Sequence, residues 1–156
     1  MKLMSTKIVL TISMAVMLFA GSLAFAPTPK ASAASTCSNA VNTVYSYGGY
    51  STCIGNIQTM IDGLYSVWGS NTSGCVAGYA ISYLTVDNSF GPKTRSVITS
   101  FQHKSCIAHD GIVGRQTWSF LCGNVSDNYV YSRGSAMTAA YNAGLRSGCR
   151  SLLSYY

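Results

Sequence analysis

Two short stretches decide the fold: Asp87-Asn-Ser-Phe-Gly-Pro-Lys-Thr94 and Asp110-Gly-Ile-Val-Gly-Arg-Gln-Thr117. Both follow the pattern D-x-x-(F or V)-G-x-x-T. An Asp followed by Asn or Gly is typical of a turn, because the second residue tolerates positive φ. Phe90 and Val113 are then expected to point inward, and Pro92 suits the first position of a helix, where its missing N–H costs nothing. The repeat therefore predicts two structured turns, each of which opens a helix.

Apolar residues at three-to-four spacing predict short helices around these turns. We expect helices at about 53–65, 92–104 and 115–121, and a further one at 135–145 near the C-terminus. The residues expected to face inward are Ile54, Ile57, Met60, Ile61, Leu64, Val97, Ile98, Phe101, Trp118 and Leu121. Residues 68–78 resemble a loop, which Cys75 would tether. The sequence thus predicts an all-α fold.

The first residues have the features of a secretory signal peptide. Lys2 and Lys7 form a basic start, residues 8–26 are uncharged and largely apolar, and Ala31-Ser-Ala33 provides a cleavage site. The sequence therefore predicts a signal peptide at 1–33 and an extracellular or cell-wall-associated mature protein with no membrane attachment. The alternative is an uncleaved anchor, because the uncharged run is nearly long enough to span a bilayer.

Cleavage also changes the charge of the protein. It removes Lys2, Lys7 and Lys30 but no acid, so the formal net charge falls from +6 to +3. The remaining cations are dispersed, which disfavours nucleic acid as a partner. The chain contains no glutamate, and this counts against glycosidases and metalloproteases, which usually need one.

All six cysteines follow the predicted cleavage site: Cys37, Cys53, Cys75, Cys106, Cys122 and Cys149. An even number in a small exported chain predicts three disulfides, for which about fifteen connectivities are possible. Because Cys37 and Cys149 lie near opposite ends of the mature chain, one hypothesis is that they join the two tails, 34–52 and 123–156, across the helical core.

The ordered motifs resemble the peptidoglycan-binding domain-1 family over residues 53–122. The matching features are the Gln58 helix, the two D-x-x-x-G-x-x-T turns, Phe101-Gln102 and Thr117-Trp118 followed by Leu121. The resemblance implies a small three-helix domain that binds bacterial cell-wall peptidoglycan, usually as the targeting module of a wall hydrolase. Two departures are Asn88 in place of the usual Gly, and a longer segment between Leu64 and Val86.

Candidate ligand-binding residues lie beside the two turns: Tyr83, Lys93, Arg95, His109 and Arg115. Arg and Lys suit the carboxylates of wall stem peptides, and an exposed Tyr suits a sugar face. The expected partners are the glycan strand and the stem peptide, together with a separate wall hydrolase. Phe101 and Trp118 are expected in the core, and not as sugar platforms, because they share the helical stripe.

No catalytic constellation stands out. Ser147-Gly-Cys149-Arg150 is similar to the nucleophile motif of L,D-transpeptidases, but it lacks the His, and the segment after Cys122 is too short for that catalytic domain. Asp87 and Asp110 suit turn capping better than a catalytic carboxylate pair.

No metal site stands out either. His103 and His109 are the only histidines, too few for a zinc site of three protein ligands unless an Asp joins them. We therefore expect neither a metal nor a cofactor.

The sequence thus predicts a secreted, non-catalytic carbohydrate-binding module with an N-terminal tail at 34–52, a domain at 53–122 and a C-terminal extension at 123–156. Two alternatives stay open. One is a small wall hydrolase that uses an Asp with His109, or a free Cys149. The other is a secreted effector or inhibitor that reuses the scaffold to bind a protein.

Overall fold

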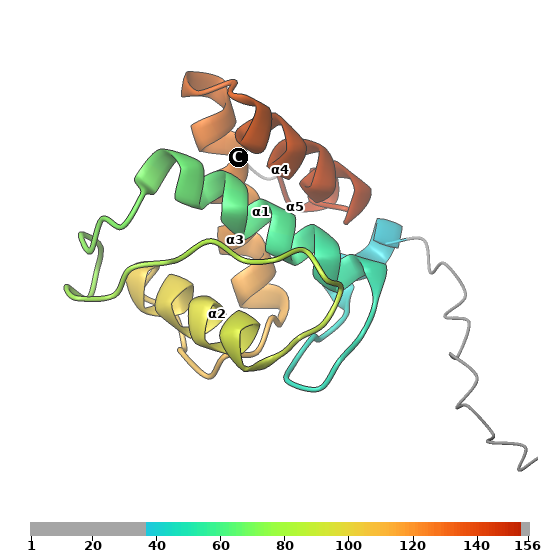
Figure 1. Cartoon of the computed structure of the whole chain (residues 1–156). Helices are drawn as coiled ribbons and strands as arrows, with labels where there is room; N and C mark the ends of the chain where they lie inside the picture. The colour runs from blue at the N-terminus through green and yellow to red at the C-terminus, as the bar shows by residue number, and fades with distance from the viewer. Residues whose placement is uncertain (1–36, 154–156) are drawn as a thin grey trace, which may run out of the picture. The chain divides into compact units, whose positions relative to one another are not determined.

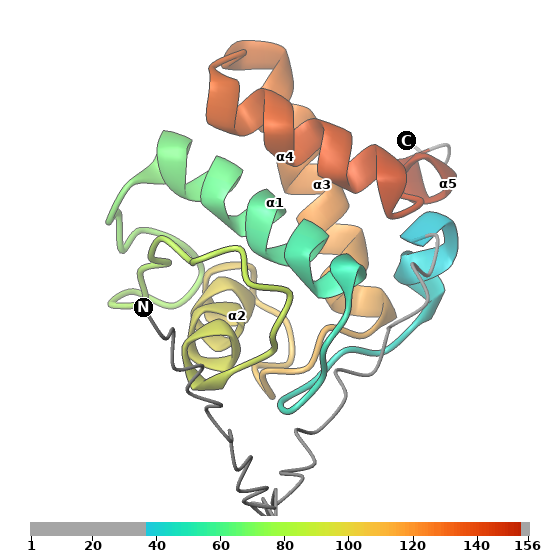
Figure 2. The same cartoon turned by 45° about the vertical axis from the view of Figure 1, so that its right-hand side comes forward.

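Helix α1, Thr52–Trp68, lies between α2, Pro92–Lys104, and α4, Ser135–Arg146, in both views of the computed structural model (Figures 1 and 2). The structure describes residues 37–153, so the predicted signal peptide lies outside the described residues. The remaining elements are the short 3-10 helix η1, Cys37–Asn42, α3, Arg115–Tyr131, and α5, Arg150–Leu153. No strand occurs within residues 37–153, and the predicted all-α fold is confirmed.

A polar cap and an apolar stripe explain why α1 forms where it does. Ser51 precedes the helix, and its Oγ accepts a hydrogen bond from the Ile54 N–H at 3.3 Å, which satisfies one of the free donors of the first turn. The stripe predicted from the sequence is fully buried, as in Ile57, Met60 and Leu64. The helix runs to Trp68, three residues beyond its predicted end.

The most extensive helix contact in the described part of the chain joins α1 to α4. It depends on small residues: Gly63 of α1 faces Ala140 of α4, and Gly144 of α4 lies over Met60. Without a Cβ at Gly63, the two backbones approach closely. The C-terminal helix predicted from the sequence therefore packs directly on the first helix of the domain.

Helix α3 is longer than the sequence analysis indicated. It was expected to end near Leu121, but it continues to Tyr131. Val125 explains the extension, because it continues the inward stripe of Trp118, Leu121 and Cys122 and is 2% exposed. The exposed Phe120 and the polar residues between these positions make this stripe hard to recognise in the sequence.

All six cysteines form disulfides, as predicted: Cys37–Cys53, Cys75–Cys106 and Cys122–Cys149. The expectation that Cys37 pairs with Cys149 was wrong. η1 is instead bonded to the start of α1, and the turn after α4 is bonded to α3. Each tail is therefore fixed separately to the helical core, and Cys75 tethers the loop after α1 as expected.

Among residues 37–153, no helix combines the length and the apolar character that a bilayer crossing requires.

Candidate ligand-binding groove

A buried glutamine of α1 holds the first of the two repeated turns. The Gln58 side-chain amide donates to Asp87 Oδ1 at 2.8 Å, to the Ser89 carbonyl at 3.0 Å and to Thr94 Oγ1 at 3.2 Å. Its carbonyl oxygen accepts from the backbone N–H groups of Asp87 and Asn88. Gln58 is 1% exposed, so the turn supplies the hydrogen-bond partners that this buried side-chain amide needs.

The second turn is held in the same way by Gln102, near the end of α2. Its amide donates to Asp110 Oδ1, the Ile112 carbonyl and Thr117 Oγ1 at 2.9–3.0 Å. Its carbonyl oxygen accepts from the Gly111 N–H. Gln102 is 0% exposed. The two repeated sequence motifs thus form nearly the same hydrogen-bond pattern, with one buried glutamine for each turn.

The turn residues act as the pattern predicted. Asn88 has φ 63° and Gly111 has φ 72°, so the Asn that replaces the family's Gly adopts the same left-handed conformation. Asp87 Oδ1 also accepts from the Ser89 N–H, and Asp110 Oδ1 from the Ile112 N–H. Hydrogen bonds from Gln58 and from the Ser89 N–H hold the pKa of Asp87 below its ordinary value. The predicted turn-capping role of both aspartates is confirmed.

The segment before α1 joins the two turns to each other. Tyr45 exchanges two backbone hydrogen bonds with Val113, and Gly48 and Gly49 pair with Phe90. Phe90 and Val113 occupy equivalent positions of the repeat, and both are 0% exposed. This backbone pairing places residues 43–51, including Tyr47, beside the start of α2.

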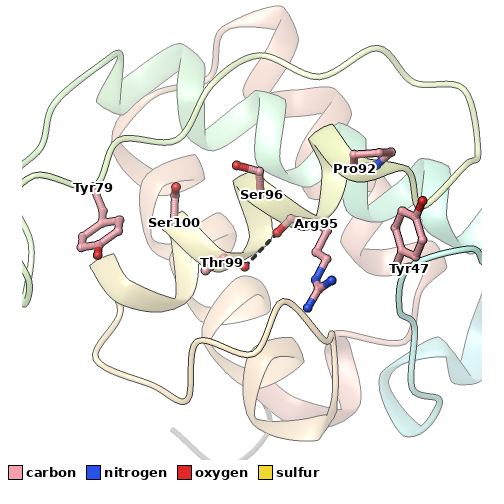
Figure 3. A pocket seen from close by; sticks show the side chains of 7 residues that line it. All are labelled: Tyr47, Tyr79, Pro92, Arg95, Ser96, Thr99 and Ser100. Atoms are coloured by element: carbon pink, nitrogen blue, oxygen red, sulfur yellow. Dashed lines mark hydrogen bonds between the residues drawn. The ribbon is translucent and has the colours of Figure 1, made fainter.

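An open groove of about 540 Å³ follows the outer face of α2. Figure 3 shows Tyr47 near the first turn of the helix, Tyr79 near its last turn, and Arg95 between them with its guanidinium directed toward the loop before α3. The other lining residues are Pro92 and three hydroxyl residues: Ser96, Thr99 and Ser100. The groove therefore has an aromatic ring at each end and hydrogen-bonding groups between them.

Close packing fixes the floor of this groove. A Cβ on Gly111 would lie 2.8 Å from Cγ of Arg95 and 2.9 Å from Oγ1 of Thr99. Only a glycine therefore lets the second turn approach α2 this closely. The side chain of Arg95 lies against that turn, and the residue as a whole is exposed.

Three rings stack at the C-terminal end of the groove. The centroids of Tyr79 and His103 are 3.7 Å apart, and those of His103 and His109 are 3.8 Å apart, with the ring planes close to parallel. His103 lies between the other two rings. Loss of hydration and the nearby His109 lower the pKa of the His103 imidazole. The neutral form of His103 is therefore favoured.

A smaller cavity of about 190 Å³ shares Pro92 with the groove and is lined in part by Lys93, Asp87 and Leu84. Asp62 of α1 is buried close by and accepts a hydrogen bond from the Leu84 N–H at 2.7 Å. Burial raises the pKa of Asp62, while the Leu84 N–H and the charge of Lys93 lower it. The charge of Lys93 therefore acts on a carboxylate of the protein itself.

The structure brings together only some of the residues proposed from the sequence. Arg95 lines the groove, and His109 belongs to the ring stack at its end. Lys93 lines the smaller cavity. Arg115 is exposed at the start of α3, and Tyr83 is 60% exposed on the loop between α1 and α2, outside the residues that line the groove.

Sequence reasoning missed most of the groove. Neither Tyr47, which lies in the N-terminal tail, nor Tyr79, which follows the expected loop at 68–78, was among the predicted ligand-binding residues. The hydroxyl residues of α2 could have been found, because Ser96, Thr99 and Ser100 lie on the polar face opposite the buried stripe. Phe101 and Trp118, predicted to be core residues, are both 0% exposed, so that prediction is confirmed.

Comparison with protein families gives one match. The model of the family described as "Putative peptidoglycan binding domain" matches residues 76–121, which include both turns, the whole of α2 and most of the residues that line the groove. No match was found among curated proteins or among solved structures. Gln58 lies outside the matched residues, yet it repeats the geometry of Gln102. The match to residues 76–121 confirms the resemblance that the paired turns indicate, and the general function that it supports is peptidoglycan binding.

Proposed function

We propose that this is a secreted, non-catalytic protein that binds cell-wall peptidoglycan through the groove on α2, with the glycan strand and the stem peptide as its partners. The observation on which this depends is the groove itself. It lies on the matched domain, and its lining combines two tyrosines, three hydroxyls and one arginine. Peptidoglycan offers matching groups, namely sugar rings, hydroxyls and amides on the glycan and carboxylates on the peptide.

Three of the four aspartates, Asp62, Asp87 and Asp110, support binding without catalysis, and the fourth, Asp127, is exposed on α3 outside the groove lining. Asp87 and Asp110 accept hydrogen bonds from their own turns and from a buried glutamine. Asp62 is buried against the Leu84 N–H. These carboxylates are occupied in structural roles, whereas a general acid or base must reach a substrate proton.

The state of Cys149 points in the same direction. The sequence left open a hydrolase that uses this residue as a nucleophile, but Cys149 is bonded to Cys122 and is 3% exposed. A nucleophilic cysteine must be an accessible thiolate. The disulfide also supports export, because such bonds persist in oxidising compartments, where the predicted signal peptide would deliver the chain.

The test is sedimentation of the mature protein with purified insoluble peptidoglycan, with turbidity followed on the same material. We expect the protein to sediment without clearing the suspension. Clearing would favour the wall hydrolase, and a protein that stays in the supernatant would contradict the proposal and favour an effector with a protein partner.

A matched pair of variants connects the binding to the groove. Arg95→Ala should weaken sedimentation several-fold, because Arg95 is the only cation among the described residues that line the groove. Arg133→Ala, which removes an exposed arginine packed over Tyr129 on the far end of α3, should leave sedimentation unchanged.

A further inference from the structure

One end of the groove is built more rigidly than the other. Tyr47 is 59% exposed, whereas Tyr79 is 38% exposed and has one ring face stacked on His103. Stacking on His103 leaves the opposite face and the edge of the Tyr79 ring for a ligand. A rigid aromatic ring contributes a large contact area and loses little conformational entropy on binding.

The loop that contains Tyr79 is fastened to the C-terminal end of α2 by several bonds. Cys75 is joined to Cys106 by a disulfide, and the Cys75 N–H donates to the Lys104 carbonyl at 3.2 Å. Lys104 Nζ in turn donates to the carbonyls of Asn71 and Ser73. Residues 71–79 are all exposed, so these contacts, and not core packing, hold the loop in position.

The Cys75–Cys106 disulfide differs from the buried pair Cys122–Cys149. Both Cys75 and Cys106 are exposed, whereas Cys122 and Cys149 are 1% and 3% exposed. Cys75 therefore adds little to the hydrophobic core. Its bond closes the loop four residues before Tyr79 and next to the turn that follows His103, which suits a role in positioning the stacked rings.

We propose that Tyr79, held against His103 by the Cys75–Cys106 disulfide, is a sugar-stacking subsite that receives the apolar face of an N-acetylated pyranose of the glycan strand. Ser96, Thr99 and Ser100 then lie along α2 to bond the hydroxyls and amides of the sugars that follow. This inference rests on the proposed function, because it assigns one part of peptidoglycan, the glycan, to one end of the groove.

The test uses the mature protein and two probes: soluble chito-oligosaccharides, which contain N-acetylglucosamine but no peptide, and insoluble peptidoglycan. Tyr79→Ala should lower the affinity for both probes about tenfold, the scale of losing one well-placed aromatic contact. Tyr79→Phe keeps the ring and should retain binding. Tyr131→Ala, which removes a 90% exposed tyrosine at the end of α3, is the matched control and should also retain it.

A second variant tests the role of the disulfide. Replacing Cys75 and Cys106 together with serine keeps Tyr79 but releases its loop, and the other two disulfides still fasten the core. We expect weaker binding of both probes and an unchanged far-ultraviolet circular dichroism spectrum. Unchanged affinity in this variant would overturn the positioning role of the bond.

The outcomes separate this inference from the proposed function. If Tyr79→Ala binds peptidoglycan as well as the wild type does, the subsite is overturned and the proposed function stands. Binding of peptidoglycan without any binding of chito-oligosaccharides overturns the glycan assignment in the same way. If the wild type binds chito-oligosaccharides through Tyr79 but does not sediment with peptidoglycan, the subsite is supported and the proposed function fails.

Discussion

The Gln102 side-chain amide donates to Asp110 Oδ1 at 3.0 Å, and in the preceding turn Gln58 stands in the same relation to Asp87 at 2.8 Å. Each glutamine projects from a helix that precedes its turn in the chain. Each turn then opens the next helix, so the two glutamines set the spacing of α1, α2 and α3. Because Arg95 and Thr99 rest on the second turn, the Gln102 contact also fixes the floor of the groove.

Gln102→Ala is therefore expected to destabilise the protein by about 3 kcal/mol, because it removes the hydrogen bonds that its buried amide makes to the second turn. The Gly111 N–H loses its acceptor, and Thr117 loses a donor. Gln116→Ala, at an exposed position of α3, is the control and should change stability by less than about 0.5 kcal/mol. Urea denaturation measures both, and equal effects of the two substitutions would contradict the role assigned to Gln102.

Replacing either of two helical glycines with alanine should change the stability of the protein, but in opposite directions. A Cβ on Gly63 would meet Ala140 and lie 3.2 Å from the Ala136 carbonyl oxygen, so Gly63→Ala should force α1 and α4 apart at a cost of about 1–3 kcal/mol. A Cβ on Gly123 of α3 would meet nothing within 4 Å. Gly123→Ala should therefore stabilise the protein by about 0.5–1 kcal/mol, because glycine weakens a helix interior. Thermal unfolding of the two variants gives the comparison, and destabilisation of similar size in both would show that helix contact is not what Gly63 provides.

Much of the fold could be predicted because its signals are local. Pro92 marks the start of α2, and the predicted range of that helix agrees with the structure. The paired turns, the core positions of Phe101 and Trp118, and the tether at Cys75 also follow from neighbouring residues. The disulfide pairing could not be predicted in this way, because it depends on how η1 and the end of α4 pack against the core.

Most of the groove could not be predicted from the sequence, for a different reason. Tyr47 and Tyr79 come from segments on either side of α1, and each is brought to α2 by contacts between residues that lie far apart in the sequence. Tyr47 is placed by backbone bonds from its segment to Phe90 and Val113. Tyr79 is placed by a disulfide and by the Lys104 amine. A site assembled from such contacts becomes visible only in the folded chain.

Asp62 offers a test of a buried carboxylate that does no chemistry in our proposal. Asp62→Ala should cost about 1–3 kcal/mol, because the Leu84 N–H would lose its acceptor in a buried position. Asp62→Asn keeps an acceptor oxygen and removes the charge. The asparagine variant should therefore be at least as stable as the wild type at neutral pH.

The pH dependence of Asp62 has a definite sign. Burial raises its pKa, so the folded state holds the proton more tightly than the unfolded state. The stability that this contributes is present below the ordinary carboxyl pKa of about 4, and it is lost as the pH rises through the higher value of the folded state. Denaturation of the wild type and of Asp62→Asn across this window measures the effect, and parallel pH profiles would contradict it.

The His103 imidazole should make the protein less stable in mild acid. Its pKa is lowered by loss of hydration and by His109, so the unfolded chain takes up the proton first as the pH falls. The contribution of neutral His103 to stability should be fully present above the ordinary histidine pKa of about 6.5. It should decline as the pH falls toward the lower pKa that His103 has in the folded state. His103→Phe keeps a ring for Tyr79 to stack on but cannot titrate, so this variant should lose less stability than the wild type over that range. Nuclear magnetic resonance titration of the His103 ring gives the direct measurement. A His103 midpoint at or above the ordinary value would mean that the stacked rings do not exclude water from the imidazole.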